Sequence, residues 1–162
     1  MLVPQRRFDL DVEQLQRRYR GLMAEAHPDR HGHLDAAEQQ KMADHASDIT
    51  DAYAVLRAPH LRAVHLLELL GTPLDEDTGG EVLGPEFLMH VMETREELEE
   101  AGAEVPRIQA LRDANENAMS ELHTQLGDAF ASQNLDEARA LTARLQYLQR
   151  IEDEAKERLP VS

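Results

Sequence analysis

The sequence predicts an all-α protein built from two helical units. In every long segment the apolar residues recur at steps of three and four, and no segment shows the period-two alternation of a strand. A glycine-rich stretch, residues 71–84, separates an N-terminal group of helices from a C-terminal group. We therefore predict a helical hairpin domain at residues 1–72, a linker at 73–84 and an antiparallel three-helix bundle at 85–162.

The composition excludes several classes of function. With 32 acidic and 17 basic side chains, the net charge of −15 argues against nucleic-acid binding, because phosphates require a basic surface. The chain has no cysteine, which excludes disulfides, Cys-ligated zinc and clusters held by its own thiolates. It contains no signal peptide, transit peptide or apolar span of membrane length, so we expect a cytoplasmic protein that does not bind membranes.

The charge is distributed unevenly along the chain. Residues 1–34 contain six Arg and five acidic residues, whereas the remaining chain has 17 minus 6, or 11, basic residues and 32 minus 5, or 27, acidic residues. The N-terminal end is therefore nearly neutral with clustered Arg, and the rest has a balance of −16. This contrast suggests two partners with different electrostatic properties.

Three helices are predicted in the N-terminal unit. The first covers residues 11–26 and should end at His27, because a residue before proline is disfavoured in the α region. A second long helix begins after Asp35, which can cap it. A short apolar helix covers about 61–70 and is stopped by Gly71. The predicted buried stripe of the second helix consists of Met42, Ala46, Ile49, Tyr53 and Leu56.

Three further helices are predicted in the C-terminal unit. Pro85 suits the first turn of a helix that runs to about Ala101. The next helix carries apolar residues at helical spacing from Ile108 to Phe130. The last helix follows "SQNLDEA", and its predicted core stripe consists of Leu141, Leu145, Leu148 and Glu152. Short turns between the three helices predict an antiparallel arrangement.

The first helix ends in an exposed tripeptide, His27-Pro28-Asp29. Proline fixes its own φ and restricts the residue before it, so the loop loses little entropy when a partner docks. The alternatives are an ordinary helix terminator, an acid–base pair of His27 and Asp29, and a metal site that adds His31 and His33. No concave pocket is expected for acid–base chemistry, and loop histidines are mostly incidental. We therefore expect no catalytic residue, metal or cofactor.

A basic helix face leads up to this loop. On a helical wheel, Arg17 and Arg20 lie opposite the apolar stripe of the first helix, and the second helix ends in "DITDAYAVLRAP". Together with the tripeptide, these features resemble a J-domain, the ATPase-stimulating module of DnaJ-type co-chaperones. The resemblance implies that this region binds a DnaK-type chaperone and triggers its ATP hydrolysis. The implied chaperone-binding residues are His27, Pro28, Asp29, Arg17, Arg18 and Arg20.

The segment "PEFLMHVMETREELEE", residues 85–100, carries two apolar stripes. The expected core stripe consists of Phe87, Val91, Thr94 and Leu98. Leu88, Met89 and Met92 point away from it, and Glu93, Glu96 and Glu100 extend this second face. Either the helix is sandwiched between the bundle and the N-terminal unit, or the second stripe is exposed and binds a partner. On the last helix Tyr147 and Ile151 lie off the core stripe, and an antiparallel neighbour could bring Tyr147 beside the methionines.

A closer resemblance covers nearly the whole chain. "HLRAVHLLELLG", followed by a loop and "FLMHVMETREELEE", is similar to the HscB family, J-type co-chaperones of iron–sulfur cluster biogenesis. The similarity extends from "VPQRRFDLD" to "RLQYLQRIEDEAKERL". It implies that the C-terminal unit binds an IscU-like cluster scaffold and delivers it to an HscA-like chaperone. The implied scaffold-binding residues are Leu88, Met89, Met92, Glu93, Glu96, Glu100 and Tyr147.

Some features depart from the family pattern. Members usually begin with a short helix that braces the J-domain, whereas this chain starts at "MLVPQRRFDLD"; either that helix is missing or the start codon is misassigned. His31 stands where an aromatic often follows the tripeptide, and Tyr147 replaces a more usual phenylalanine. The alternative functions are a general J-type holdase for unfolded clients and a small His-loop metal-binding protein. Weak self-association through the methionine stripe is a further alternative.

Overall fold

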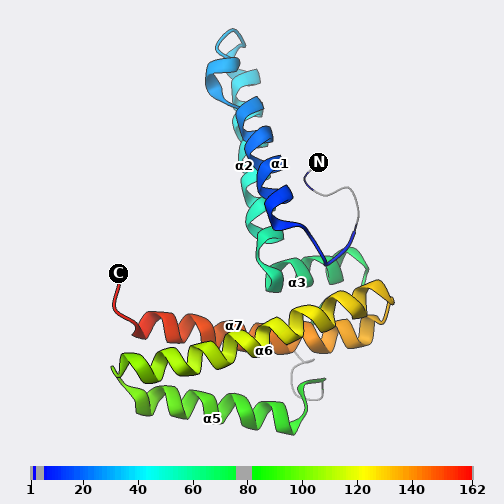
Figure 1. Cartoon of the computed structure of the whole chain (residues 1–162). Helices are drawn as coiled ribbons and strands as arrows, with labels where there is room; N and C mark the ends of the chain where they lie inside the picture. Colours follow the sequence, from blue (N-terminus) through cyan, green and yellow to red (C-terminus); the bar gives the residue numbers. More distant parts are fainter. Residues whose placement is uncertain (1, 3–5, 76–81, 162) are drawn as a thin grey trace.

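The computed structural model describes residues 2, 6–75 and 82–161, in which helices are the only regular secondary structure (Figure 1). The helices are α1 (Val12–Glu25), the 3-10 turn η1 (Pro28–Arg30), α2 (Ala36–Arg57), α3 (Pro59–Leu69), α5 (Pro85–Ala101), α6 (Val105–Ala131) and α7 (Leu135–Arg158). The predicted all-α fold is confirmed. Residues 76–81 of the predicted linker lie outside the described residues. No helix in the described part of the chain is long and apolar enough to span a membrane.

Local sequence determines most helix ends. The Asp11 side chain accepts a hydrogen bond from the first turn of α1, and Asp35 forms a reciprocal capping box at the start of α2. Gly71 follows α3 with a φ of +76°, a left-handed conformation that glycine adopts without a Cβ penalty. α3 begins at Pro59, two residues earlier than predicted, because proline fits the first helical turn, where its missing N–H is not needed.

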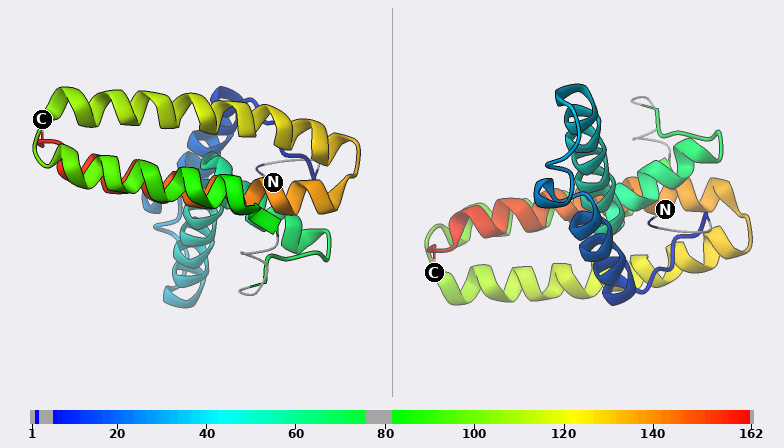
Figure 2. Two further views of the ribbon diagram at one scale, coloured as in Figure 1. Left: turned by 90° about the horizontal axis from the view of Figure 1, so that it is seen from below. Right: turned by 90° about the horizontal axis from the view of Figure 1, so that it is seen from above.

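α1 and α2 form an antiparallel hairpin that stands across the bundle, as the views in Figure 2 show. The Tyr19 and Tyr53 rings stack between the two helices, with centroids 4.1 Å apart. Leu15 and Ile49 are the buried residues of the two helices. The hairpin therefore has a thin core of its own, and its loop lies at the end far from the bundle (Figure 1).

α5, α6 and α7 pack on one another as a three-helix bundle. Asn115 of α6 donates a buried hydrogen bond to the Leu148 carbonyl of α7, and these two helices are antiparallel. α5 and α7 run in the same direction, with Arg95 on α5 paired to Glu154 on α7 at 2.7 Å. Our expectation of an antiparallel neighbour beside Tyr147 is therefore wrong. That neighbour is the parallel helix α5, because α6 reverses the chain between them.

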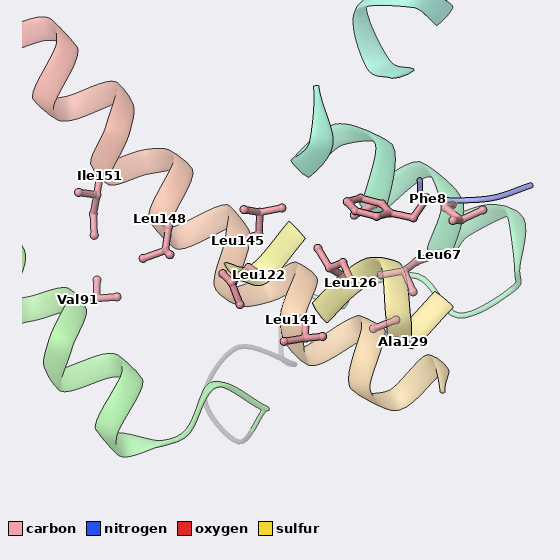
Figure 3. Packing of buried hydrophobic residues seen from close by; sticks show 13 residues of the cluster. Phe8, Leu67, Val91, Leu122, Leu126, Ala129, Leu141, Leu145, Leu148 and Ile151 are labelled. Carbon is pink, nitrogen blue, oxygen red and sulfur yellow. The ribbon is translucent and has the colours of Figure 1, made fainter. Parts of the chain in front are cut away.

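One hydrophobic cluster extends through both units. In Figure 3, Phe8 and Leu67 lie against α6, while Val91 of α5 faces α7 further along the same core. The buried members are Phe8, Ala63, Leu66, Leu67, Val91, Leu122, Leu126, Ala129, Ala138, Leu141, Leu145, Leu148 and Ile151. Ile151 is only 2% exposed, so the prediction that it lies off the core stripe is wrong. The core face of α7 is wider than the wheel suggested, because both α5 and α6 pack on it.

The N-terminal unit is anchored to the bundle by α3 and by the segment before α1. α3 packs on α7, and the Phe8 ring stacks on Phe130 of α6 with centroids 5.8 Å apart. Burial of apolar surface is the main source of such packing energy, at roughly 25 cal/mol per Å². The hairpin is therefore held on the side of the bundle opposite α5 (Figure 1).

Candidate functional site

The His27-Pro28-Asp29 tripeptide forms a tight and exposed turn. His27 has an extended backbone, as the following proline requires, and is the N-cap of η1. The Asp29 N–H donates to His27 Nδ1 at 3.2 Å, so in the neutral ring Nε2 carries the proton. The two side chains are 59% and 92% exposed, respectively. The turn thus presents an imidazole donor and a carboxylate to solvent.

His31 fastens this turn to the end of α1. Its Nε2 lies 2.7 Å from the Glu25 carbonyl oxygen and must donate, since a carbonyl only accepts. This bond satisfies a carbonyl in the last turn of the helix, where intrahelical partners are missing. Among the described residues, no group of three or more His, Cys, Asp or Glu side chains is placed to hold a metal ion. The structure therefore shows that His31 holds the turn on the end of α1.

The three arginines predicted to support the loop differ in their surroundings. Arg17 and Arg20 on α1 are exposed, in agreement with the predicted basic face. Arg18 is half-buried and donates to the Leu2 carbonyl at 3.1 Å. Its guanidinium is thus partly used within the chain, and the freely accessible basic groups are those of Arg17 and Arg20.

An apolar cleft of about 750 Å³ lies beside the loop, between α1 and α2. Met23 and Met42 line it from opposite helices, and His27 and Asp29 lie at its loop end. Met42 was predicted to lie in the buried stripe of the second helix, and no role was predicted for Met23. Helical spacing places both on the inner faces of their helices, but it does not show that a cleft lies between these faces near the loop.

α5 has one buried and one exposed apolar face. Val91 and Leu98 are 3% and 1% exposed and face α6 and α7. Met89 and Met92, at 61% and 63%, face solvent, while Leu88 is half-buried at the border. Since the N-terminal unit packs on α7 from the other side, the sandwich interpretation is wrong. α5 therefore keeps an apolar stripe exposed to solvent.

Acidic and aromatic side chains border this stripe. Glu93, Glu96 and Glu100 are exposed, and Glu100 pairs with Arg107 of α6 at 3.1 Å. Tyr147 of α7 is half-buried and makes an edge-to-face contact with Phe87, with ring centroids 6.4 Å apart. The parallel packing of α5 and α7 thus brings Tyr147 against Phe87 in the first turn of α5. Phe87 directly precedes Leu88 in the sequence.

Basic side chains with lowered pKa values meet where the N-terminal unit packs on the bundle. Burial lowers the pKa of His60 on α3, against the opposing effect of Asp153 on α7. The pKa of His123 on α6 is lowered by burial, and then by the positive charges of Arg62 and His60. Arg62 is itself buried and lies over the Phe8 ring at 4.8 Å. The junction favours neutral imidazoles, a property that the sequence does not signal because these residues are far apart in the chain.

Comparison with known proteins gives the same assignment for both units. Residues 83–156 match the model of the HSCB C-terminal oligomerisation domain. The co-chaperone protein HscB homolog of Azoarcus sp. (strain BH72) is 36% identical over 157 residues, which cover 95% of this chain and 88% of that protein. The crystal structure of human co-chaperone protein HscB has a TM-score of 0.85 at 29% identity, covering 94% of this chain and 77% of that chain.

A second solved structure extends the likeness to a bacterial protein. The chaperone HscB from Vibrio cholerae has a TM-score of 0.82 at 25% identity, and the match covers 96% of this chain and 93% of that chain. Sequence identity therefore spans the hairpin, the junction and the bundle, and the arrangement of these parts is shared with solved structures. The curated relative and the two solved structures are HscB proteins that share most of this chain, so the chain belongs to the HscB family.

Proposed function

We propose that this protein is a cytoplasmic co-chaperone that delivers an IscU-like iron–sulfur scaffold to an HscA-like, DnaK-type ATPase chaperone. It has no catalytic activity of its own in this scheme. The observation that carries the proposal is the presence of two exposed surfaces, the His27-Pro28-Asp29 turn and the α5 stripe. The turn and α5 lie at opposite ends of the molecule (Figure 1).

The first surface is the J-domain surface. His27, Pro28 and Asp29 present a rigid donor–acceptor pair, and the exposed Arg17 and Arg20 supply positive charge beside it. The basic face would steer the chaperone by long-range attraction, so association should weaken as the salt concentration rises. Arg18 adds positive charge, although one of its N–H groups is used by the Leu2 carbonyl.

The second surface binds the scaffold. Leu88, Met89 and Met92 would be buried against an apolar site on the partner, and methionine suits such a site because its side chain adapts to irregular shapes. The surrounding polar contacts would come from Glu93, Glu96, Glu100 and Tyr147. Because one chain holds both partners, the scaffold reaches the chaperone at a high effective concentration without any new contact between them.

The Asp29→Asn substitution tests the J-domain role. The Asp29 side chain is 92% exposed, so the substitution should leave the circular dichroism spectrum and the melting temperature unchanged. It should abolish the stimulation of chaperone ATP hydrolysis, because the amide cannot provide the carboxylate charge. The matched control is Asp44→Asn on the exposed side of α2, which should retain stimulation. Full stimulation by the Asp29 variant would contradict the proposal.

Binding to a folded partner separates this function from that of a general holdase. The chain should bind a folded IscU-like scaffold and should not suppress the aggregation of denatured model proteins. Broad suppression of aggregation, with no preference for the scaffold, would favour the holdase alternative.

A further inference from the structure

We propose that Arg150 is a further scaffold-binding residue, and that it binds a carboxylate of the scaffold where α7 borders α5. This inference rests on the proposed function, since it concerns the same surface. It adds a cationic contact to a surface that otherwise offers apolar and acidic groups, and it specifies the chemistry of the partner opposite.

The position of Arg150 follows from the register of the two parallel helices. Leu88, Met92 and Arg95 occupy steps of four and three on α5, so they form one stripe along that helix. Arg95 reaches Glu154 of α7 at 2.7 Å, so this stripe borders α7. The side of α5 that carries Leu88 and Met92 therefore lies next to α7.

A matching stripe on α7 borders α5. Tyr147, Arg150 and Glu154 occupy steps of three and four on that helix. The Phe87–Tyr147 contact and the Arg95–Glu154 pair fix this stripe against α5 at its two ends. Arg150 lies between these two contacts along α7.

The guanidinium of Arg150 is held at this place by an aromatic ring. Its central carbon lies 5.3 Å from the centroid of Tyr147, within the range of a cation–π interaction. A planar guanidinium that is already oriented loses less entropy when it binds a carboxylate, and it can do so through two parallel N–H bonds. The stacking thus prepares Arg150 for an acidic group.

Arg150 also stands apart from the other bundle arginines in the described part of the chain, because no ion pair or hydrogen bond involves it there. The arginines with such a partner, in an ion pair or at a backbone carbonyl, are Arg95, Arg107, Arg112, Arg139, Arg144 and Arg158. An exposed arginine in a chain of net charge −15 has many acidic residues available, yet this one keeps its N–H groups free. It is therefore available for an external anion.

The opposite charge lies on the outer side of α5. Glu93 and Glu96 are exposed, and within the described residues neither is engaged in an ion pair. Beside the Arg95–Glu154 ion pair, whose charges offset one another, Arg150 is thus an unpaired cation on α7, and Glu93 and Glu96 are unpaired anions on α5, in the part of the chain that the structure describes. A complementary partner carries an acidic side chain facing Arg150, an apolar group over Met92 and basic side chains facing the glutamates. This polarity also sets the direction in which the partner lies across the two helices.

The test is a charge series at position 150 in the full chain, titrated with a purified, folded IscU-like scaffold. Since exposed ion pairs contribute little, Arg150→Ala should weaken binding by about two- to fivefold. Arg150→Glu should weaken it by roughly tenfold or more at low salt, because repulsion replaces attraction, and by less at high salt. Arg150→Lys, which keeps the charge, should bind more tightly than Arg150→Ala.

Two controls make the result specific. Lys41→Glu, on the exposed side of α2, changes the net charge equally and should leave scaffold binding unchanged. If Arg150 only supported the Tyr147 ring, the Glu and Ala variants would bind equally and with the same salt dependence, and the inference would be overturned.

The proposed function is tested separately in the same titration. If Met89→Ala with Met92→Ala weakens binding while Arg150→Glu does not, the scaffold surface stands and the role of Arg150 is refuted. If the unmodified chain does not bind the scaffold, the proposed function fails, and this inference fails with it.

Discussion

The exposed stripe on α5 can be tested independently of the core on the same helix. The perturbation is the double substitution of Met89 and Met92 by alanine. These side chains are 61% and 63% exposed, so about three-fifths of each remains to be buried by a partner. Full burial of a methionine is worth about 1.5–3 kcal/mol, which gives about 1–2 kcal/mol for each exposed portion. The pair should therefore contribute about 2–4 kcal/mol to scaffold binding, or roughly 30- to 1,000-fold in Kd.

The same substitution should have little effect on folding. Exposed positions away from the core usually change the free energy of unfolding by about 0.5 kcal/mol or less, so we expect a loss below about 1 kcal/mol for the pair. The matched control is Leu98→Ala, two turns further along α5, where the side chain is 1% exposed. This variant leaves a cavity and should lose about 2–5 kcal/mol of stability. It should leave the affinity of the folded fraction for the scaffold unchanged.

The assays are isothermal titration of the scaffold and thermal unfolding of each variant. In a chain of this length each kcal/mol of lost stability lowers the melting temperature by roughly 2–4 °C, so Leu98→Ala should be clearly separated from the methionine pair. The reasoning is refuted if the Met89/Met92 variant unfolds as easily as Leu98→Ala. It is also refuted if scaffold affinity changes by less than about twofold, since the exposed area would then contribute nothing.

Two further predictions concern the junction. The pKa values of His60 and His123 are lowered in the folded state, so as the pH falls the unfolded chain takes up protons before the folded chain does. The stability that the two neutral rings contribute is therefore full above about pH 6.5 and is lost as the pH falls below that value. Replacing both histidines by Asn should weaken the dependence of the melting temperature on pH between about pH 7.5 and 5.5, whereas His33→Asn in the exposed loop should not. The same pH dependence in the double variant and the unmodified chain would contradict this prediction. A Cβ at Gly127 would lie 2.7 Å from the Asp9 carboxylate oxygens. Because alanine favours a helix more than glycine does, Gly127→Ala should stabilise the chain by about 1 kcal/mol when Asp9 is also replaced by Ala. With Asp9 present the gain should be smaller, because the close contact opposes it. If Gly127→Ala changes the free energy of unfolding in denaturant equally with and without Asp9→Ala, the close contact has no energetic consequence.

Much of the local structure was determined by the sequence alone. The ends of α1, α2 and α5 lie where Asp11, Asp35 and Pro85 predicted them, because capping and proline effects involve only neighbouring residues. The extended backbone of His27 follows in the same way from the proline after it. The periodicity also separated Met89 from the core side of α5, since residues on one face recur at fixed steps.

Tertiary structure alone decided which of these faces meet. Helical periodicity defines the faces of a helix but contains no information about its neighbours, so it left open whether α5 was sandwiched or exposed. For the same reason it missed the burial of Ile151, which depends on α5 packing parallel to α7. The junction of His60, Arg62 and His123 arises where segments distant in the chain share one core. Burial, pairing and the direction of each surface are properties of that packing, because they depend on long-range contacts that no local pattern encodes.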